Sequence, residues 1–225
     1  MSTPLTRIET APDYVDQVCR AVVDAISSGE FQPGQRLTQE DIARRLSVSR
    51  QPVLQALRIL KKDGVLQDAP GRGLQVTPLD ATSIARVYEV RGALDALAAR
   101  LAAQRRAVLD PALISAGRRA VKSRNVQAMI DADLEFHHAI YAASGNPLLA
   151  RSAAVHWLHV RRAMGAVLQR SVLRQTVWDE HEAIAAAIHA GGGATAERLM
   201  HAHTRQAAQH LIQHFAKETP HAAQP

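Results

Sequence analysis

The stretch Ile42-Ala43-Arg44-Arg45-Leu46-Ser47-Val48-Ser49-Arg50-Gln51-Pro52-Val53 predicts two helices joined by a short connection. Apolar residues recur at helical spacing on both sides of it, so one helix ends near Leu46 and another begins at Ser49. Ser49 is a suitable N-cap, and Pro52 falls in the first turn, where its missing N–H is tolerated. Because so few residues separate the two helices, this stretch is typical of a helix-turn-helix.

Residues on both sides of this stretch complete a three-helix unit with a hairpin. Upstream, a helix is expected over residues 14–28, because valines and an isoleucine recur there at three- and four-residue steps. Thr38, followed by Asp41, approximates a capping box that opens the next helix. Downstream of the third helix, residues 65–67 and 74–76 favour two short strands around a turn-rich loop. Three helices and a hairpin predict a winged helix-turn-helix.

Positive charge is concentrated around the connection. Residues 42–62 contain no acidic side chain and six basic ones: Arg44, Arg45, Arg50, Arg58, Lys61 and Lys62. The third helix begins with free N–H groups and a positive dipole that suit a phosphate, and Arg50 there is also placed to reach a guanine edge. Arg72, between two glycines at the hairpin tip, suits the minor groove or the backbone. Each charge taken alone is more often a solvated helix face, but together they predict binding to double-stranded operator DNA through Ser49, Arg50, Gln51, Arg72, Arg44 and Arg58.

The remainder of the chain predicts helices and no strands. Turn signals at Asp110-Pro111, at Ser144-Gly145-Asn146-Pro147 and at Gly191-Gly192-Gly193 separate helical segments near 81–105, 110–122, 126–143, 147–170, 172–190 and 194–216. Aromatic residues make up only 4% of the chain, which also favours helices over strands. The expected fold is mostly α: a winged helix-turn-helix and an all-α six-helix bundle.

The expected organisation has two domains. The winged helix-turn-helix spans 12–76, a linker follows at 77–80, and the bundle, an effector-binding and dimerisation domain, spans 81–217. Residues 1–11 are expected to be a flexible N-terminus and residues 218–225 a flexible tail.

Composition narrows the class of protein further. Cys19 is the single cysteine, so an internal disulfide is excluded. The first twelve residues lack the apolar region of a signal peptide, and no apolar run approaches the roughly 18–20 residues of a membrane span. We therefore expect a cytoplasmic protein with no membrane partner. The net charge of +6 mildly favours an acidic partner.

All eleven histidines lie at or beyond position 137, and a subset of them points toward the bundle interior. Asp133 and His137 are four residues apart and share one helical face. His181 and His203 each lie on an apolar helical stripe. One carboxylate and three imidazoles directed into a bundle suit a divalent transition metal: Zn²⁺, Ni²⁺, Mn²⁺ or Fe²⁺. The alternative is a set of core histidines satisfied by hydrogen bonds.

The N-terminal motifs resemble the GntR family of bacterial transcription regulators over about residues 12–78. The resemblance is carried by Gly29-x-x-x-Pro33-Gly34-x-x-Leu37, Ile42-Ala43-x-x-Leu46-x-Val48-Ser49-Arg50-x-Pro52-Val53, Ala56-Leu57-x-x-Leu60, Gly64-x-Leu66 and Arg72-Gly73-x-x-Val76. The family usually has Arg-Glu where Leu54-Gln55 stands here, and some members have Arg near Glu40. The resemblance therefore implies an atypical operator or weaker DNA binding.

The C-terminal motifs are similar to the FCD effector domain of the FadR subgroup, in its six-helix VanR-like branch, over about residues 80–215. The resemblance is carried by Asp133-x-x-Phe136-His137-x-x-Ile140, Ser144-Gly145-Asn146-Pro147, Glu180-His181-x-x-Ile184-x-x-Ala187-Ile188 and Ala196-x-x-x-Met200-x-x-His203. It implies that Asp133, His137, His181 and His203 bind a metal on which a small carboxylate effector docks. Arg91 matches a family arginine and is a candidate effector clamp, with a structural pair to Asp95 as its alternative. Asn146 is a second candidate contact that would otherwise cap a helix.

The expected function is a ligand-responsive transcription regulator that acts as a homodimer, and the family's commoner mode implies a repressor released by its effector. One alternative is a regulator whose effector is the metal itself. A remote alternative is a metal-dependent enzyme with a nucleic-acid-binding head, for which the chain offers no general base beyond Glu180 or Glu135, so we expect no enzyme. A further alternative is an architectural DNA-binding protein, in which the inward-pointing Asp133, His137, His181 and His203 would have no function.

Overall fold

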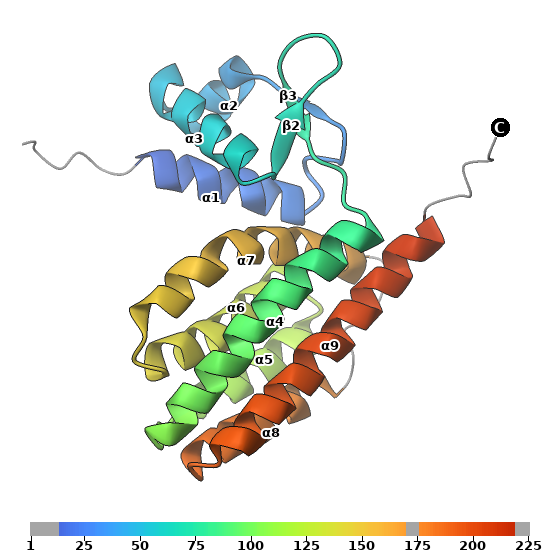
Figure 1. The fold of residues 1–225 in the computed structure, drawn as a ribbon. Helices are drawn as coiled ribbons and strands as arrows, with labels where there is room; N and C mark the ends of the chain where they lie inside the picture. The colour runs from blue at the N-terminus through green and yellow to red at the C-terminus, as the bar shows by residue number, and fades with distance from the viewer. Residues whose placement is uncertain (1–13, 170–175, 219–225) are drawn as a thin grey trace, which may run out of the picture.

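The computed structural model describes residues 14–169 and 176–218, and in this part of the chain a small N-terminal head rests on a helical bundle (Figure 1). The head contains three helices and three short strands: α1 (Tyr14–Ser27), β1 (Arg36–Leu37), α2 (Gln39–Leu46), α3 (Arg50–Lys62), β2 (Leu66–Asp68) and β3 (Leu74–Val76). The winged helix-turn-helix prediction is confirmed. Strand β1 was missed by sequence reasoning because two residues carry no readable alternation.

Local signals fix the turn between α2 and α3. The Thr38 hydroxyl accepts a hydrogen bond from the Asp41 N–H, as the capping box predicts, and Ser47 ends α2 in the left-handed region with φ 53°. Ser49 occupies the N-cap of α3, but its side chain makes no capping bond. Its hydroxyl is therefore not engaged at the end of α3.

The wing is a small antiparallel sheet with strand order β1-β3-β2. Leu66 pairs with Val76, and both side chains are buried against Val53 and Leu60 of α3 in a single apolar cluster. The buried positions of α1 complete this cluster, so the third helix is held firmly while its opposite face stays exposed.

Six helices form the second layer: α4 (Ala81–Gln104), α5 (Ala112–Ser123), α6 (Val126–Ala143), α7 (Pro147–Leu168), α8 (Val177–His189) and α9 (Gly193–Glu218). The six predicted segments are confirmed, although part of the predicted 172–190 segment lies outside the described residues. The predicted flexible N-terminus, 1–11, lies outside them, and so does the predicted tail 218–225 except for Glu218, which is the last residue of α9. None of the described helices is long and apolar enough to cross a membrane.

Small residues let the long helices of the bundle approach closely. Helices α4 and α9 run side by side (Figure 1), and a Cβ added at Gly92 would lie 3.1 Å from the Thr204 hydroxyl. Phe136 and Ile140 of α6 are fully buried beneath them. The core of the bundle therefore lies around α6, whose inward face also carries polar residues.

Helix α7 joins the bundle to the head. Gly165 packs against α1 so closely that a Cβ there would lie 2.1 Å from the Ser27 carbonyl oxygen, to which the Gln169 amide donates at 2.9 Å. Arg161 pairs with Asp24 of α1 and also with Asp131 of α6. These contacts tie α1 to the bundle through one helix.

Two further polar contacts hold the rest of the head on α7. Arg162 is buried and donates to the carbonyl oxygen of Thr77, next to β3. His159 Nε2 lies 2.8 Å from the carbonyl oxygen of Asp63, which follows α3. Burial lowers the pKa of Arg162 to about 10. Helix α7 thus contacts both the first helix of the head and the end of its third helix, α3.

Candidate metal centre and DNA-reading surface

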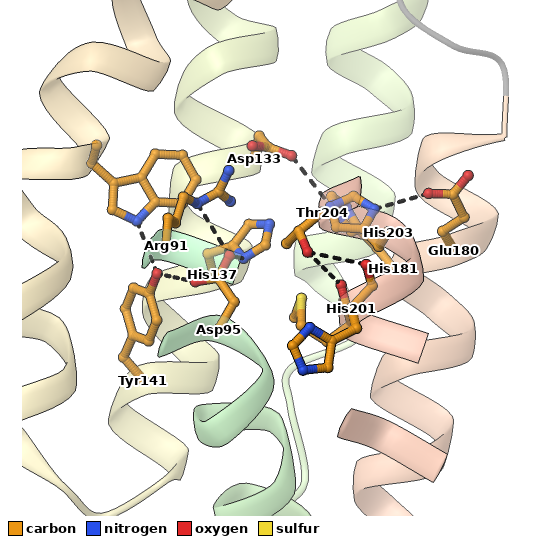
Figure 2. A network of polar contacts seen from close by, with 12 residues as sticks. Arg91, Asp95, Asp133, His137, Tyr141, Glu180, His181, His201, His203 and Thr204 are labelled. Carbon is orange, nitrogen blue, oxygen red and sulfur yellow. Dashed lines mark hydrogen bonds and ion pairs between the residues drawn. The ribbon is translucent and has the colours of Figure 1, made fainter. Parts of the chain in front are cut away.

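Four polar side chains meet in the interior of the bundle. Asp133 and His137 come from α6, His181 from α8 and His203 from α9 (Figure 2). All four are buried, and one ligand atom from each lies within 4.8 Å of the others. The structure therefore brings together the four residues that the sequence singled out.

The spacing of these atoms fits the coordination sphere of a transition metal. His181 Nε2 lies 3.2 Å from His203 Nε2 and 3.5 Å from a carboxylate oxygen of Asp133. Ligands that hold an ion at about 2.0–2.2 Å stand roughly 3.0–3.5 Å apart when they are neighbours around it. Within the described part of the chain, neither ring nitrogen of buried His137 makes a hydrogen bond. An ion would satisfy one of these nitrogens, so the donor set fits a metal.

The electrostatics of His137 favour a neutral imidazole. Burial lowers its pKa well below the ordinary value of 6.5, and the positive charge of Arg91 and the neighbouring His203 and His181 lower it further. A metal binds the lone pair of a neutral ring. His137 therefore needs no deprotonation near neutral pH to act as a ligand.

Two carboxylates lie behind the candidate ligands and face the other nitrogen of two imidazoles. Glu180 accepts from His203 Nδ1 at 2.9 Å and is itself held by the Thr176 hydroxyl at 2.9 Å. Asp95 lies 3.4 Å from His137 Nδ1. A proton held on Nδ1 leaves Nε2 free to bind an ion. The sequence indicated Glu180 only as a candidate general base. Its contact with His203 joins two different helices, and helical spacing alone does not show which helices are neighbours.

Arg91 is a buried cation next to this cluster. Its Nε lies 3.1 Å from Asp95, and its guanidinium stacks 3.9 Å above the ring of Trp157. Burial lowers the pKa of Arg91, but Asp95 beside it and the Tyr88 hydroxyl raise it more, so the side chain stays charged. Its Nη2 is buried without a hydrogen-bond partner among the described residues. The ion pair with Asp95 that the sequence offered as the alternative role of Arg91 is thus present. The Nη2 donor of Arg91 remains available to a ligand.

The carboxylate of Asp95 is the centre of a buried polar network. Tyr141 donates its hydroxyl proton to Asp95, and Trp157 Nε1 donates to the Tyr141 oxygen at 3.1 Å (Figure 2). Burial raises the pKa of the Asp95 carboxyl, while Arg91 opposes that effect. Asp95 therefore links Arg91 to Tyr141 and, through Tyr141, to Trp157.

A cavity of about 50 Å³ opens beside Arg91, Asp133 and His203. Its other walls come from α4, α7, α8 and α9, with mostly apolar side chains: Tyr88, Met164, Val167, Leu168, Val177, Ala207, His210 and Leu211. Asn146 does not line this cavity. It caps α7 by accepting from the Leu148 N–H at 3.1 Å, which is the structural alternative noted for it in the sequence.

The six predicted DNA contacts are all exposed on the head: Arg44, Ser49, Arg50, Gln51, Arg58 and Arg72. Arg50 is paired with Glu40 of α2 at 3.2 Å, and Arg44 is paired with Asp41. Gln55 is exposed on α3 and Leu54 is half-buried. The reading surface therefore carries acids beside its arginines, a feature that the count of basic residues in 42–62 did not reveal.

Comparisons with known proteins agree with both halves of this picture. Residues 14–76 match the model of bacterial regulatory proteins of the gntR family, and residues 86–206 match the FCD domain. The chain is 30% identical over 202 residues to the HTH-type transcriptional regulator LutR of Bacillus subtilis, covering 79% of this chain and 92% of LutR. It is 32% identical over 95 residues to the uncharacterised HTH-type regulator YdhC of the same species.

The extent of these matches varies. The alignment with YdhC spans 42% of either chain, and those with two other regulators span 61% of each, less than two thirds of their length. Among solved structures, E. coli McbR/YncC superposes with a TM-score of 0.79 at 20% identity, covering 92% of this chain and 100% of that one. At that identity the likeness concerns the fold.

Proposed function

Since the chain belongs to the GntR family of bacterial transcription regulators and carries an FCD domain, we propose that its bundle holds a divalent transition metal and a small carboxylate effector that together set its affinity for operator DNA. The observation that carries this proposal is the convergence of four buried ligand atoms within 4.8 Å. Asp133, His137, His181 and His203 would hold the ion, which is Zn²⁺, Ni²⁺, Mn²⁺ or Fe²⁺ by its ligand set.

The effector would be anchored between the metal centre and Arg91. A bound ion with protein ligands on one side supplies open positions that a carboxylate can take. Arg91 contributes a permanent charge and a buried Nη2 that has no hydrogen-bond partner among the described residues. Desolvated guanidinium–carboxylate pairs are strong because the charges are little screened. This free donor favours an organic acid as effector over the metal alone.

Helix α7 offers a physical route from this site to the DNA head. Trp157 on α7 touches Arg91 and stands edge-on to His137, while Arg161 and Arg162 on the next turn hold the head. An effector that prefers one arrangement of α7 would shift the population of head arrangements. The chain would act as a homodimer on a near-palindromic operator, since two heads on one DNA gain affinity together. It would be a repressor that its effector releases.

Metal content tests the first part of the proposal. His181→Ala and His203→Ala each remove one of four ligands, so we expect neither variant to retain stoichiometric metal in elemental analysis. His189→Ala is the matched control, because His189 lies on α8 but is exposed. Undiminished metal in both ligand variants would overturn the assignment.

Operator binding tests the second part. The probe is the DNA flanking the protein's own gene, compared with a scrambled duplex at fixed salt, since unspecific binding is strongly salt-dependent. We expect specific binding by the metal-loaded protein and a change in affinity when small carboxylates are added. If affinity instead follows metal concentration and ignores carboxylates, the metal itself is the effector.

A further inference from the structure

The chain that follows α3 rests on α7 through one imidazole ring. His159 Nε2 lies 2.8 Å from the carbonyl oxygen of Asp63, and His159 Nδ1 lies 3.4 Å from Nη1 of Arg162. The same ring lies against Gly64, where an added Cβ would stand 3.6 Å from His159 Cε1. His159 therefore connects the head to a buried cation of the bundle.

These two polar contacts together allow only one form of the ring. A carbonyl oxygen accepts and cannot donate, so Nε2 must carry a proton. A guanidinium donates and cannot accept, so Nδ1 must keep its lone pair. His159 is thus a neutral imidazole that donates to Asp63 and accepts from Arg162. A second proton can bind only at Nδ1, the nitrogen that faces the guanidinium.

Arg162 offers no negative charge that would offset a second cation beside it. It is only 2% exposed, it makes no ion pair with a described residue, and its Nε has no hydrogen-bond partner among them. Burial lowers its pKa to about 10, so the guanidinium stays charged near neutral pH. A protonated His159 would therefore lose the hydrogen bond from Arg162 and be repelled by it, with little water between them to screen the repulsion.

We propose that His159 is a pH switch, which holds the α3 side of the head on α7 while its ring is neutral and frees that side when the ring is protonated. The switch goes beyond the proposed function, because it involves neither the metal ligands nor an effector. Arg161 still pairs with Asp24 of α1, so the other side of the head would stay attached.

The groups around His159 favour its neutral form. Burial lowers the pKa of His159 below the ordinary value of 6.5, and Arg162 and, to a lesser extent, His156 lower it further. Asp63 raises it through its carbonyl and its carboxylate, but by less. From α4, Tyr88 lines the same small cavity as His159 and stays neutral, because burial raises its pKa to about 12.

The direction of the pH effect follows from this lowered pKa. A freed His159 regains a pKa near 6.5, so below that pH the freed arrangement takes up the proton before the attached one does. The contact is therefore intact above about pH 6.5 and is lost as the pH falls below it. Since one proton is linked, the equilibrium changes by at most about tenfold per pH unit.

Amide hydrogen exchange of residues 60–66 in the full-length protein tests the switch. His159→Gln is the informative variant, because its amide donates and accepts at any pH in this range and does not titrate. We expect equal exchange in wild type and variant at pH 7.5, and exchange up to about tenfold faster in the wild type at pH 5.5. Both proteins are compared at the same pH and in the same metal state, so the intrinsic exchange chemistry cancels.

Two further variants on α7 show whether the position and the charge matter. His156→Gln is the matched control: His156 is half-buried one turn earlier, and it makes no hydrogen bond with a described residue. It should keep the pH dependence of the wild type. His159→Lys places a permanent cation beside Arg162, so we expect fast exchange of residues 60–66 at pH 7.5 as well.

Operator binding reports the consequence for the proposed function. A freed α3 must be ordered again on DNA, so wild-type affinity at fixed salt should fall more than that of His159→Gln between pH 7.5 and pH 5.5. If exchange follows the switch but the two affinities change alike, the head is freed without consequence for the operator, and the role of the switch in regulation is overturned.

The exchange experiment can overturn the switch itself. Equal exchange of wild type and His159→Gln at pH 5.5 would do so, and so would a His156→Gln variant that behaves like His159→Gln. If His159→Gln already exchanges faster at pH 7.5, the wild type alone decides. The midpoint of its exchange against pH must then match the titration midpoint of the His159 ring in NMR spectra, and a mismatch overturns the switch.

Discussion

Glu180 is a single side chain that orients a candidate metal ligand without touching the metal position. Its carboxylate accepts from His203 Nδ1, so Glu180→Gln would weaken the preference for the ring form whose Nε2 is free. We expect a 10- to 100-fold loss of metal affinity in competition with a chromophoric chelator, the usual range for such partners. Glu182→Gln is the control, because Glu182 lies on α8 but pairs with Arg118 at the surface. Equal affinities for the two variants would remove Glu180 from this role.

His137 predicts a pH dependence for the stability of the metal-free protein. Its pKa in the folded state lies well below the value of 6.5 for the free side chain, mainly because it is buried. As the pH falls below about 6.5, the unfolded chain therefore takes up this proton before the folded chain does, and stability is lost. A single such group changes the free energy of unfolding by at most about 1.4 kcal/mol per pH unit.

Urea unfolding of chelator-treated protein at pH 7 and pH 5.5 measures this effect. His138, His156 and His159 also have lowered pKa values, so the wild type should lose stability from several groups at once. His137→Gln removes one titrating group, and we expect it to lose about 1 kcal/mol less than the wild type over this range. Parallel losses in both proteins would mean that His137 does not resist protonation in the fold.

Substitutions of Arg50 and Glu40 are expected to change the affinity for operator DNA in opposite directions. Arg50 lies at the start of α3, and Arg50→Ala should weaken binding to the operator by at least about 1 kcal/mol, the lower limit for a base contact. Glu40 pairs with Arg50 and places a negative charge on the reading surface, so Glu40→Gln should strengthen binding. Dissociation constants for the operator, measured at fixed salt, test both expectations. The control for loss of a positive charge is Arg151→Ala, because Arg151 is an exposed residue of α7. Unchanged binding by Arg50→Ala would make Arg50 a surface charge only.

Helix α7 is the element on which the head rests, and Gly165 is the point of closest approach. A methyl group at Gly165 would meet the Ser27 backbone at 2.1 Å, so Gly165→Ala must push α1 and α7 apart. Overpacking of this kind typically costs about 1–3 kcal/mol. We expect a lower urea midpoint and faster amide exchange in α1, together with a weakened effect of effector on operator binding.

The control for Gly165→Ala is a glycine with room for a side chain. A Cβ at Gly192 would meet its nearest atom, the Ala187 carbonyl oxygen, at an ordinary 3.6 Å. Gly192→Ala should therefore leave stability and amide exchange close to the wild type. If Gly165→Ala behaves like Gly192→Ala, the close contact between α1 and α7 does not hold the head in place.

The helices and their inward residues could be predicted because their signals are local. Thr38 and Asp41 mark a helix start by themselves, and the apolar stripes around His181 and His203 predict that both point inward. The contacts that complete the site could not be predicted, because Asp95 and Tyr141 meet across 46 residues. The same is true of Arg161 and Asp24 between head and bundle, which lie 137 residues apart. Helical periodicity gives the inward face of each helix but not which helices become neighbours.

At the scale of the described part of the molecule, helix α7 packs between the candidate metal centre and the N-terminal head. Trp157 contacts Arg91 at the buried end of this path, and His159 contacts the chain just after α3 at the other. Both of these contacts lie on α7. A ligand at Arg91 and DNA at α3 would therefore act on the same element, and they would influence each other only if each prefers a different arrangement of it.

Thermodynamic linkage turns this arrangement into a prediction about the protein on its operator. If the effector lowers operator affinity by a given factor, saturating operator must lower effector affinity by the same factor. With a small carboxylate that binds the metal-loaded protein as the probe, we expect its dissociation constant to rise when the protein is saturated with operator, by about 5- to 150-fold if the coupling is typical. A scrambled duplex at the same salt should leave it unchanged. Arg162→Gln removes the charge of the side chain that holds Thr77, and we expect it to reduce both factors together. If operator leaves the affinity for this carboxylate unchanged while the carboxylate still displaces the protein from DNA, the displacement is not linked to binding at this site, and coupling through α7 is excluded.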